Sequence, residues 1–411
     1  MRKRAPRPQP KPQRRAGTLR ISAEVARRLR DGHPWVFEDA LQGRHLNASQ
    51  QEVEIVDQAG HFVARALHDP AGPAVLRVFS RVPGRRFDGD FLVEAVGAAA
   101  RSRRRLLDLA PDGCFRALSG DCEAIPAVSV DYYAGFLVVI GYSAVVERYL
   151  DPLVSALTAV WRPKGVYLQR RYRAAPAGKG RPGAELIAGS AAGSEVIVTE
   201  DGLRYAVDVT APLGTGLFAD MRLGRRAVAR LAAGRRVLNC FSYTGAFSLV
   251  AAAHGASAVT SVDSANRAHG RARRNFGENQ IDGESTAHRF ITGDAVATMA
   301  RMAERDDRHD LVIIDPPTFS TGKGRPFTAL KDYSVLIAAA LRVLDSGGLI
   351  CAASNAAKLP TVDFDRAVAR GAADAKRQLA IVERVGQPPD YPVKVGFPES
   401  GYLKFVVAAA D

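Results

Sequence analysis

From about residue 213 onwards, short apolar runs alternate with longer segments that have helical periodicity. This alternation is typical of a parallel β-sheet whose strands are joined by helices. The expected strands are Val237–Cys240, Ala258–Val262, Arg289–Thr292, Leu311–Asp315 and Leu349–Ala353, and the expected helices lie near Phe247–Ala253, Arg267–Asn275, Ala295–Arg301 and Ala329–Leu344. Two further β-like runs, Leu379–Val385 and Leu403–Ala408, close the pattern. We therefore expect an α/β domain over residues 213–411.

The preceding residues predict two smaller domains, in keeping with a chain of 411 residues, which is long for a single domain. Residues 18–82 contain a helical stretch and then short β-like runs separated by turn residues, a spacing that suggests a small β-barrel or sandwich. Residues 83–212 combine an arginine-rich helix near Phe91–Leu109 with paired strands, two of them joined at Asp201-Gly202 as a hairpin. We expect this second part to be a central α+β domain.

Residues 1–17 predict a disordered basic tail. Seven Lys and Arg residues and no acidic residue occur among the first fifteen, which is half of the net charge of +14. The prolines between them disfavour a helix. Such an arm is attracted to phosphate by charge, and a tail that only improves solubility is the alternative. The rest of the chain is also basic, which fits nucleic-acid binding and equally fits a GC-rich coding bias.

Composition argues against membrane and disulfide-rich classes. No run of about 18 uncharged apolar residues could span a bilayer, and we expect no secretory signal. The four cysteines, Cys114, Cys122, Cys240 and Cys351, have neither disulfide-framework nor metal-ligand spacing. We therefore expect a cytoplasmic protein without a structural metal. The sequence does not reveal the oligomeric state, and a homodimer is one arrangement that it allows.

Small and acidic residues follow the first three expected strands, at the edge where a parallel sheet binds ligands. Gly245 opens the helix after the first strand, so the helix N-terminus would face a ligand. Asp263 follows the second strand, where a carboxylate can accept both ribose hydroxyls of a nucleoside, and Asp294 follows the third, where it could bond an adenine amino group. Both aspartates could instead be helix N-caps. The absence of G-x-G-x-x-G disfavours a nicotinamide site.

Asp315-Pro316-Pro317, after the fourth strand, is the strongest chemical signal in the chain. The two prolines fix the backbone and remove its donors, so the carbonyls point outward with little freedom. An aspartate and such carbonyls can hold the polar edge of a base, while Phe319 can stack on its face. A loop with two prolines and no function is the alternative.

Several segments carry a resemblance to one known family. They are His33–Phe37, Ser119–Asp131, Thr215–Arg222, Asn239–Gly245, Asp315–Pro317 and Gly401–Lys404. Together, and in this order along the chain after the tail, they resemble the rRNA large subunit methyltransferase I family. Members of that family are class I methyltransferases with an N-terminal PUA domain.

The resemblance implies a PUA-like RNA-binding β-barrel at residues 18–82, the central domain at 83–212, and a Rossmann-like catalytic domain at 213–411. It implies an enzyme that uses S-adenosylmethionine to methylate a base of 23S rRNA, either naked or in a precursor particle. The implied cofactor-binding residues are Phe241, Ser242, Tyr243, Gly245, Asp263, Asp294, Asp220 and Arg222. The same resemblance places Asp315 at this pocket, and we take Asp315, Pro316, Phe319 and Asn355 as the candidate catalytic residues.

One departure from the family concerns the mechanism. Members that make 5-methylcytosine carry a cysteine just after the fifth strand, because C5 is not nucleophilic until a thiolate has added to C6. This chain has Ser354-Asn355-Ala356 at that place. Cys351 lies earlier on the same strand, roughly 13 Å back from Asn355, and Cys240 ends the first strand. We expect both cysteines to be buried core residues.

The Asp-Pro-Pro-Thr-Phe-Ser and Ser-Asn segments instead resemble the guanine-N7 half of a bifunctional 23S rRNA methyltransferase, although Lys358 lies one place later than in that pattern. A ring nitrogen or exocyclic amine has a lone pair and needs no covalent intermediate, so positioning by Asp315 and Asn355 could suffice. The alternatives are a 5-methylcytosine enzyme with a non-standard nucleophile and a non-catalytic RNA-binding assembly factor. A methyltransferase for a small molecule or a protein is a third.

Overall fold

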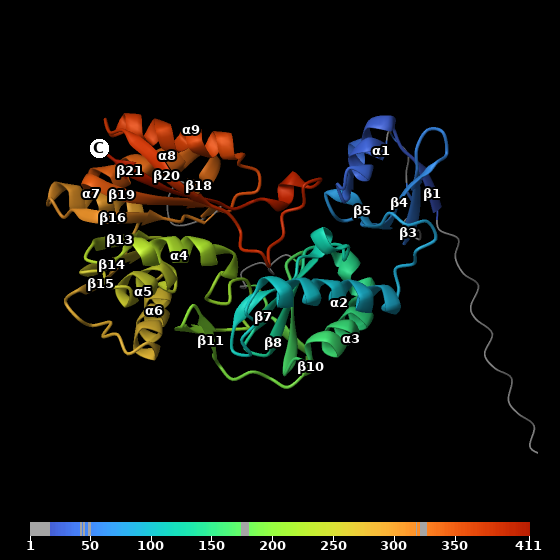
Figure 1. The fold of residues 1–411 in the computed structure, drawn as a ribbon, viewed down its shortest axis with the longest axis horizontal. Coiled ribbons are helices and arrows are strands. Elements are labelled where there is room, and N and C mark those ends of the chain that lie inside the picture. Colours follow the sequence, from blue (N-terminus) through green and yellow to red (C-terminus); the bar gives the residue numbers. More distant parts are fainter. Residues whose placement is uncertain are drawn as a thin grey trace, which may run out of the picture.

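A computed structural model of the chain describes residues 17–41, 43, 46–47, 51–173, 181–317, 319–320 and 327–411, with only the backbone of 319–320 and 327–331. The predicted basic tail therefore lies almost entirely outside the described residues. The described part forms three regions, each built around its own sheet (Figure 1). None of the described helices is both long and apolar enough to cross a membrane.

The N-terminal region is a small β-structure with one helix packed on it. Its sheet has the order β1-β3-β4-β5-β2, in which β1 runs parallel to β3 and the other pairs are antiparallel. The Ser22 side chain caps the helix by accepting from the Val25 amide at 3.4 Å. The elements are β1 (Gly17–Arg20), α1 (Ala23–Arg30), β2 (Trp35–Phe37), β3 (Glu52–Val56), β4 (Phe62–His68) and β5 (Ala74–Ser80). The small β-fold predicted for this part of the chain is confirmed.

The central region packs two helices against a mixed five-stranded sheet. The sheet order is β10-β9-β8-β7-β6, with β8 and β9 parallel and the other pairs antiparallel. The elements are α2 (Gly89–Leu106), β6 (Cys114–Leu118), β7 (Val128–Tyr133), β8 (Phe136–Gly141), α3 (Leu150–Trp161), β9 (Gly165–Arg170) and β10 (Glu185–Gly189). The hairpin predicted at Asp201-Gly202 follows as β11 (Val196–Glu200) and β12 (Leu203–Val207), fully antiparallel.

The C-terminal region is a seven-stranded sheet of order β15-β14-β13-β16-β19-β21-β20. The first five strands run parallel, and β21 pairs antiparallel with β19 and β20. The elements are α4 (Arg222–Leu231), β13 (Arg236–Cys240), α5 (Ala246–Ala253), β14 (Ala258–Asp263), α6 (Asn266–Glu278), β15 (His288–Thr292), α7 (Ala295–Glu304), β16 (His309–Ile314), β17 (Phe319–Ser320), β18 (Phe327–Thr328), α8 (Ala329–Arg342), β19 (Leu344–Ser354), α9 (Thr361–Asp374), β20 (Leu379–Val385) and β21 (Lys404–Ala410). The predicted Rossmann-like α/β sheet, closed by a strand pair, is confirmed.

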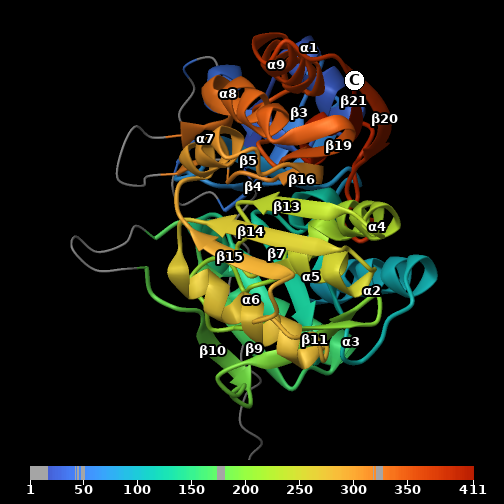
Figure 2. The same ribbon diagram turned by 90° about the vertical axis from the view of Figure 1, so that its left-hand side faces the viewer.

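Helices cover both faces of this sheet, with α4, α5 and α6 on one side and α7, α8 and α9 on the other (Figures 1 and 2). Side chains alternate between the faces along each strand. In β13, for example, Val237 belongs to the core with α4 and α5, whereas Leu238 belongs to the core with α7 and α8. This two-sided burial explains why the parallel strands read as continuous apolar runs in the sequence.

The segment between β20 and β21 leaves the sheet and contacts the other two regions (Figure 1). Phe397 packs edge-to-face on Trp35 of the N-terminal region, with 4.5 Å between ring centroids, and His33 bonds Glu399 at 3.2 Å. Asp390 accepts from the Arg116 amide of the central region at 2.8 Å. Residues about 270 positions and more apart in sequence thus fix the C-terminal sheet against both preceding regions.

Candidate active site

The loop between β13 and α5 has an unusual backbone. Phe241 and Tyr243 have φ values of 60° and 47°, in the left-handed region that side chains rarely adopt, and Gly245 has φ of 74°. Each such non-glycine residue costs on the order of 1 kcal/mol, and such strain concentrates at functional sites. At Gly245 a Cβ atom would also lie only 2.8 Å from the Ala272 Cβ of α6. The loop therefore turns sharply and packs directly against α6, at the carboxyl edge of the sheet.

Asp263, at the end of β14, holds this loop in place. One of its carboxylate oxygens accepts from the Tyr243 amide and the other from the Ala265 amide, each at 2.8 Å. A carboxylate has about four acceptor positions, so both oxygens can still accept from a ligand. The structure thus gives Asp263 a loop-fixing role and leaves it able to bind ribose hydroxyls.

Two other predicted donor-pocket residues differ in their bonding. The Ser242 hydroxyl is buried and has no hydrogen-bond partner among the described residues, which suits a group that bonds a ligand. Asp294 is exposed and caps α7 by accepting from the Ala297 amide at 2.8 Å. Asp294 is therefore a helix N-cap, as the sequence allowed. Because the residue is exposed, it also remains accessible to a ligand.

Asp315 follows β16 directly, beside the buried Pro316 and the exposed Pro317. Burial raises the pKa of Asp315 to about 7, and the nearby Asp220 carboxylate adds to the rise, partly offset by Arg225. Burial also raises the pKa of Asp220, although a hydrogen bond from the Tyr402 hydroxyl opposes the rise. Two carboxylates thus interact at the end of β16, and the pKa of one of them, Asp315, lies near neutral pH. The predicted stacking side chain of Phe319 lies outside the described side chains.

Asn355 is exposed at the turn after β19, and a buried lysine organises that turn. The Lys404 ammonium donates to the carbonyls of Ala356 and Leu359 at 2.7 and 2.8 Å. Burial lowers the pKa of Lys404 to about 8. No role was predicted for Lys404 from the sequence, although this lysine ends the Gly401–Lys404 segment and stands at the start of the apolar run that forms β21.

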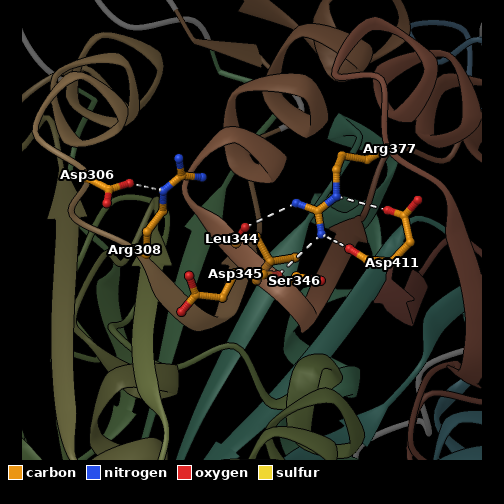
Figure 3. Close-up of a pocket in the computed structure, with 7 residues that line it drawn as sticks. All are labelled: Asp306, Arg308, Leu344, Asp345, Ser346, Arg377 and Asp411. Atoms are coloured by element: carbon orange, nitrogen blue, oxygen red, sulfur yellow. Dashed lines mark hydrogen bonds and ion pairs between the residues drawn. The ribbon is translucent and has the colours of Figure 1, made fainter.

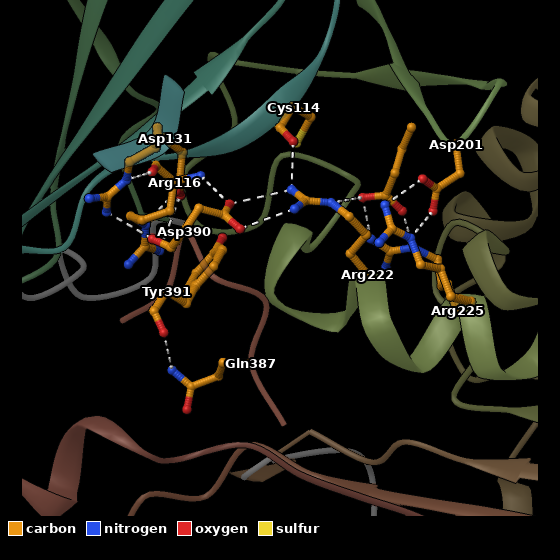
Figure 4. A network of polar contacts seen from close by, with 12 residues as sticks. Cys114, Arg116, Asp131, Asp201, Arg222, Arg225, Gln387, Asp390 and Tyr391 are labelled. Carbon is orange, nitrogen blue, oxygen red and sulfur yellow. Dashed lines mark hydrogen bonds and ion pairs between the residues drawn. The ribbon is translucent and has the colours of Figure 1, made fainter. Parts of the chain in front are cut away.

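Arg222 lies in a buried ion network between the catalytic and central regions (Figure 4). Its guanidinium bonds Glu200 at 3.3 Å, Asp390 at 3.0 Å and the Cys114 carbonyl at 2.9 Å. Arg225 forms two further bonds to Glu200 at 2.6 and 2.8 Å. Arg222 is one of the cofactor-binding residues predicted from the sequence. In the structure all three of its guanidinium nitrogens are bonded to protein groups, so its evident role is to fix the start of α4.

All four cysteines of the chain are free and buried. Burial raises the pKa of Cys240 and Cys351 to about 12 each and that of Cys122 to about 11, and raises that of Cys114 well above its ordinary value. A thiol in such surroundings stays protonated and unreactive. The expectation that Cys240 and Cys351 are buried core residues is confirmed.

Two cavities lie at the opposite edge of the sheet, by the amino ends of its strands. The larger, about 620 Å³, contains Asp345, Arg377 and Asp411, and Arg377 is bonded to Asp411 (Figure 3). The second, about 450 Å³, lies beside Arg235 and Asp310. None of the candidate site residues lines either cavity. Ligands of parallel sheets bind at the carboxyl ends of the strands, so these cavities are separate from the candidate active site.

Comparison with known proteins agrees with this geometry. Residues 140–404 match the family described as S-adenosylmethionine-dependent methyltransferase. The chain belongs to this methyltransferase family. Residues 19–81 match a PUA-like domain. The protein is therefore an enzyme whose methyl donor is S-adenosylmethionine.

Individual relatives extend over nearly the whole chain. The ribosomal RNA large subunit methyltransferase I of Photobacterium profundum is 32% identical over 92% of this chain and 95% of its own length. The protein of that name from Escherichia coli O1:K1 / APEC is 30% identical over 90% of this chain and 94% of its own. The crystal structure of SMU.776 with bound SAH has a TM-score of 0.88 and 26% identity, and covers 96% of this chain and 100% of that one. The solved structure thus shares the overall arrangement of this chain, and the two rRNA methyltransferases match it along nearly its whole length.

Proposed function

We propose that this enzyme methylates a base of the large-subunit ribosomal RNA. The observation that carries the proposal is the similarity to enzymes named for that reaction, which spans about nine-tenths of this chain. The PUA-like region and the net charge of +14 support it, since a basic protein gains affinity from the phosphate backbone. Residues 18–82 and 83–212 would hold the RNA, and residues 213–411 would carry out the transfer.

The methyl donor would bind at the carboxyl edge of β13, β14 and β15. S-adenosylmethionine supplies an electrophilic methyl group on a sulfonium. Asp263 would accept from the ribose hydroxyls and Ser242 would bond the donor through its unpaired hydroxyl. Phe241, Tyr243 and Gly245 would shape the loop beneath it, with Asp294 and Asp220 at its two sides. Arg222 would act by fixing the adjoining turn.

We assign the acceptor edge to Asp315, Pro316, Phe319 and Asn355. Asp315 and Asn355 would hold the polar edge of the base, with Phe319 stacking on its face. An acceptor nitrogen already carries the lone pair that attacks the methyl group, so orientation is the main requirement. The ionised form of Asp315 can also accept a proton from an exocyclic amine. The burial of all four thiols supports this cysteine-free route, and we propose guanine N7 or an exocyclic amine as the methylated atom.

The test is transfer of a labelled methyl group to rRNA from a strain lacking the gene, both naked and within large-subunit particles, followed by nucleoside mass spectrometry. We expect label in 7-methylguanosine or in an exocyclic N-methyl base. The Asp315→Ala variant serves as the control, because it should bind the donor without transferring the methyl group. Labelled 5-methylcytosine would refute the cysteine-free route. Normal donor binding with no label in any rRNA nucleoside would refute the rRNA substrate.

A further inference from the structure

Three large side chains are exposed on the side of the molecule that carries the donor loop. Tyr142, which follows β8, is 46% exposed; Leu213 and Phe218, which lie between β12 and α4, are 48% and 53% exposed. Aromatic and large apolar side chains that gather on a surface mark a site for a partner more often than scattered ones do. Together with Arg171, which lies between Tyr142 and Leu213, we call these four residues the aromatic track.

Contacts join Tyr142, Arg171 and Leu213 to one another, and a ring contact joins Phe218 to the donor loop. The Arg171 guanidinium lies 5.9 Å from the centre of the Tyr142 ring and donates to the Leu213 carbonyl at 3.1 Å. The Phe218 ring in turn lies 5.6 Å from the ring of Tyr243, tilted by 30°. The track therefore begins on the central region and ends at the donor loop of the catalytic region.

Hydrogen bonds hold the track in place although three of its four side chains are exposed. The Tyr142 hydroxyl bonds the buried Ser129 hydroxyl at 2.8 Å, and the buried Arg225 donates to the Phe218 carbonyl at 3.0 Å. The Tyr243 hydroxyl donates to the Gly214 carbonyl at 3.1 Å, which fixes the chain between Leu213 and Phe218. A partner that binds here would lose little entropy in ordering the protein.

Arg171 differs from the neighbouring arginines in its ion pairing. Arg170 and Arg173 both form ion pairs with Glu147. Among the residues that the structure describes, Arg171 has no acidic partner: it contacts the Gln169 side-chain oxygen at 3.4 Å and the Leu213 carbonyl. Its Nε–H is buried without a hydrogen-bond acceptor. A cation without a carboxylate partner, between an aromatic ring and an exposed apolar side chain, suits an anionic and planar ligand.

We infer that the aromatic track binds unpaired nucleotides of the RNA next to the target base. Bases that have left a helix stack on aromatic rings and on guanidinium planes, and arginine also bonds phosphate. Bound along the track, a strand would arrive at the donor loop with its base already outside a duplex, as methyl transfer to a base requires. This inference rests on the proposed function and identifies where the substrate strand lies.

The experiment measures binding of a short single-stranded oligoribonucleotide and of the same sequence as a duplex, by fluorescence anisotropy at one salt concentration. Tyr142→Ala and Arg171→Ala should each weaken single-strand binding about tenfold, the effect expected for losing one stacked base, and should change duplex binding much less. Tyr142→Phe keeps the ring and should bind as the wild type does. Val382→Ala on the edge strand β20 and Arg370→Ala on α9 are the matched exposed controls and should have no effect.

Phe218→Ala separates RNA binding from donor binding. We expect a raised KM for RNA and an unchanged Kd for S-adenosylmethionine. Weakened donor binding with unchanged single-strand affinity would overturn the assignment of Phe218. Wild-type single-strand affinity in folded Tyr142→Ala and Arg171→Ala variants would overturn the track, even where the wild type methylates rRNA. Weaker binding of those variants only to large-subunit particles, and not to the free oligonucleotide, would overturn it too, since it would indicate a protein partner.

If the proposed function is wrong but the RNA-binding track is real, the experiments give a different result. In that case the wild type transfers no methyl group to rRNA, while the track variants still lose affinity for the single strand. Melting temperatures of all variants show whether each is folded.

Discussion

The hydroxyl of Tyr402 donates a 2.7 Å hydrogen bond to Oδ2 of Asp220, a residue 182 positions earlier in the chain. Asp220 belongs to the turn that precedes α4, and its negative charge helps to raise the pKa of Asp315 at the end of β16. The segment that enters the last strand therefore acts on the ionisation of the candidate catalytic carboxylate through a second carboxylate.

The rate of methyl transfer should rise with pH near neutrality, because only the ionised Asp315 can accept a proton from the base, and the carboxylate is also the stronger hydrogen-bond acceptor. With the pKa of Asp315 at about 7, kcat/KM should increase about tenfold per pH unit below that value and level off above it. Tyr402→Phe should move the midpoint to lower pH. Without the hydroxyl, Asp220 holds its proton more strongly and repels the ionised Asp315 less. Profiles of kcat/KM against pH test both statements, and an unchanged rise in Asp315→Asn would contradict them.

The free energy of unfolding should also depend on the ionisation of Asp315. Because the pKa of Asp315 is raised on folding, its contribution to stability is full below the unfolded pKa, near 3.8, and is lost as pH rises through about 7. Asp315→Asn removes the titration and keeps the shape. We therefore expect the variant to be more stable than the wild type at about pH 8, by about 1 kcal/mol or more, since one pKa unit corresponds to about 1.4 kcal/mol. Urea unfolding at about pH 5 and pH 8 measures the change, and a difference that does not grow with pH would contradict it.

Asp263→Ala should weaken donor binding by at least about tenfold. The substitution removes the ligand-facing carboxylate and the acceptor that holds the Tyr243 amide in its strained conformation. Calorimetric titration with S-adenosylhomocysteine measures the loss. Asp294→Ala is the matched control, because this aspartate caps a helix without supporting the donor loop. It should cost about 1 kcal/mol of stability and affect binding less. Equal losses of donor affinity in the two variants would mean that the contact between Asp263 and the Tyr243 amide is unimportant for binding.

The positions of Gly245, Asp263 and Asp315 could be predicted from the sequence because each lies at or shortly after the end of an apolar strand, and strand ends in a parallel sheet meet at one edge. Helices α3, α4 and α9 were not predicted. In α3, Pro152 lies in the first turn, where its missing N–H costs nothing. In α9, Gly371 lowers helix propensity, yet it is needed because a Cβ there would lie 2.5 Å from the Ser334 carbonyl of α8.

The contacts of Tyr402, Asp390 and Lys404 could not be predicted, because each joins segments that are distant in sequence. Asp390 meets Arg222 across 168 positions, and Lys404 meets Ala356 across 48. No periodicity or spacing marks such a partner; only the packing of the three regions brings it near. Arg222 is an example: it lies beside the predicted pocket in sequence, and in the structure its guanidinium bonds Asp390, 168 positions later in the chain.

Cys351→Ala should leave methyl transfer nearly intact in the folded enzyme. The Cys351 side chain is fully buried in the core formed with α4 and α5, so the change should cost on the order of 1 kcal/mol of stability through the small cavity that it leaves. Transfer rates measured well below the melting temperature separate this loss from catalysis. A folded variant without activity would show that a covalent cysteine route operates after all.

Lys404→Met should lower kcat while leaving donor affinity unchanged. The substitution keeps the length of the buried side chain but removes the ammonium that bonds the Ala356 and Leu359 carbonyls, so the turn that carries Asn355 loses its fixed shape. Each of the two buried carbonyls left without a donor should cost about 1 to 3 kcal/mol of stability. Lys358→Met, at an exposed position of the same turn, is the control and should be close to the wild type.

The pH dependence of stability tests the same lysine independently of activity. Burial lowers the pKa of Lys404 from 10.5 to about 8, so the folded state releases this proton at a lower pH than the unfolded chain does. Its contribution to stability is then full above about pH 10.5 and is lost as pH falls through about 8. The wild type should therefore gain stability over Lys404→Met as pH rises from about 8 to 10, because the neutral amine still donates to both carbonyls. Chemical unfolding of both proteins across that interval measures the gain, and a constant difference would show that the ammonium is not desolvated by folding.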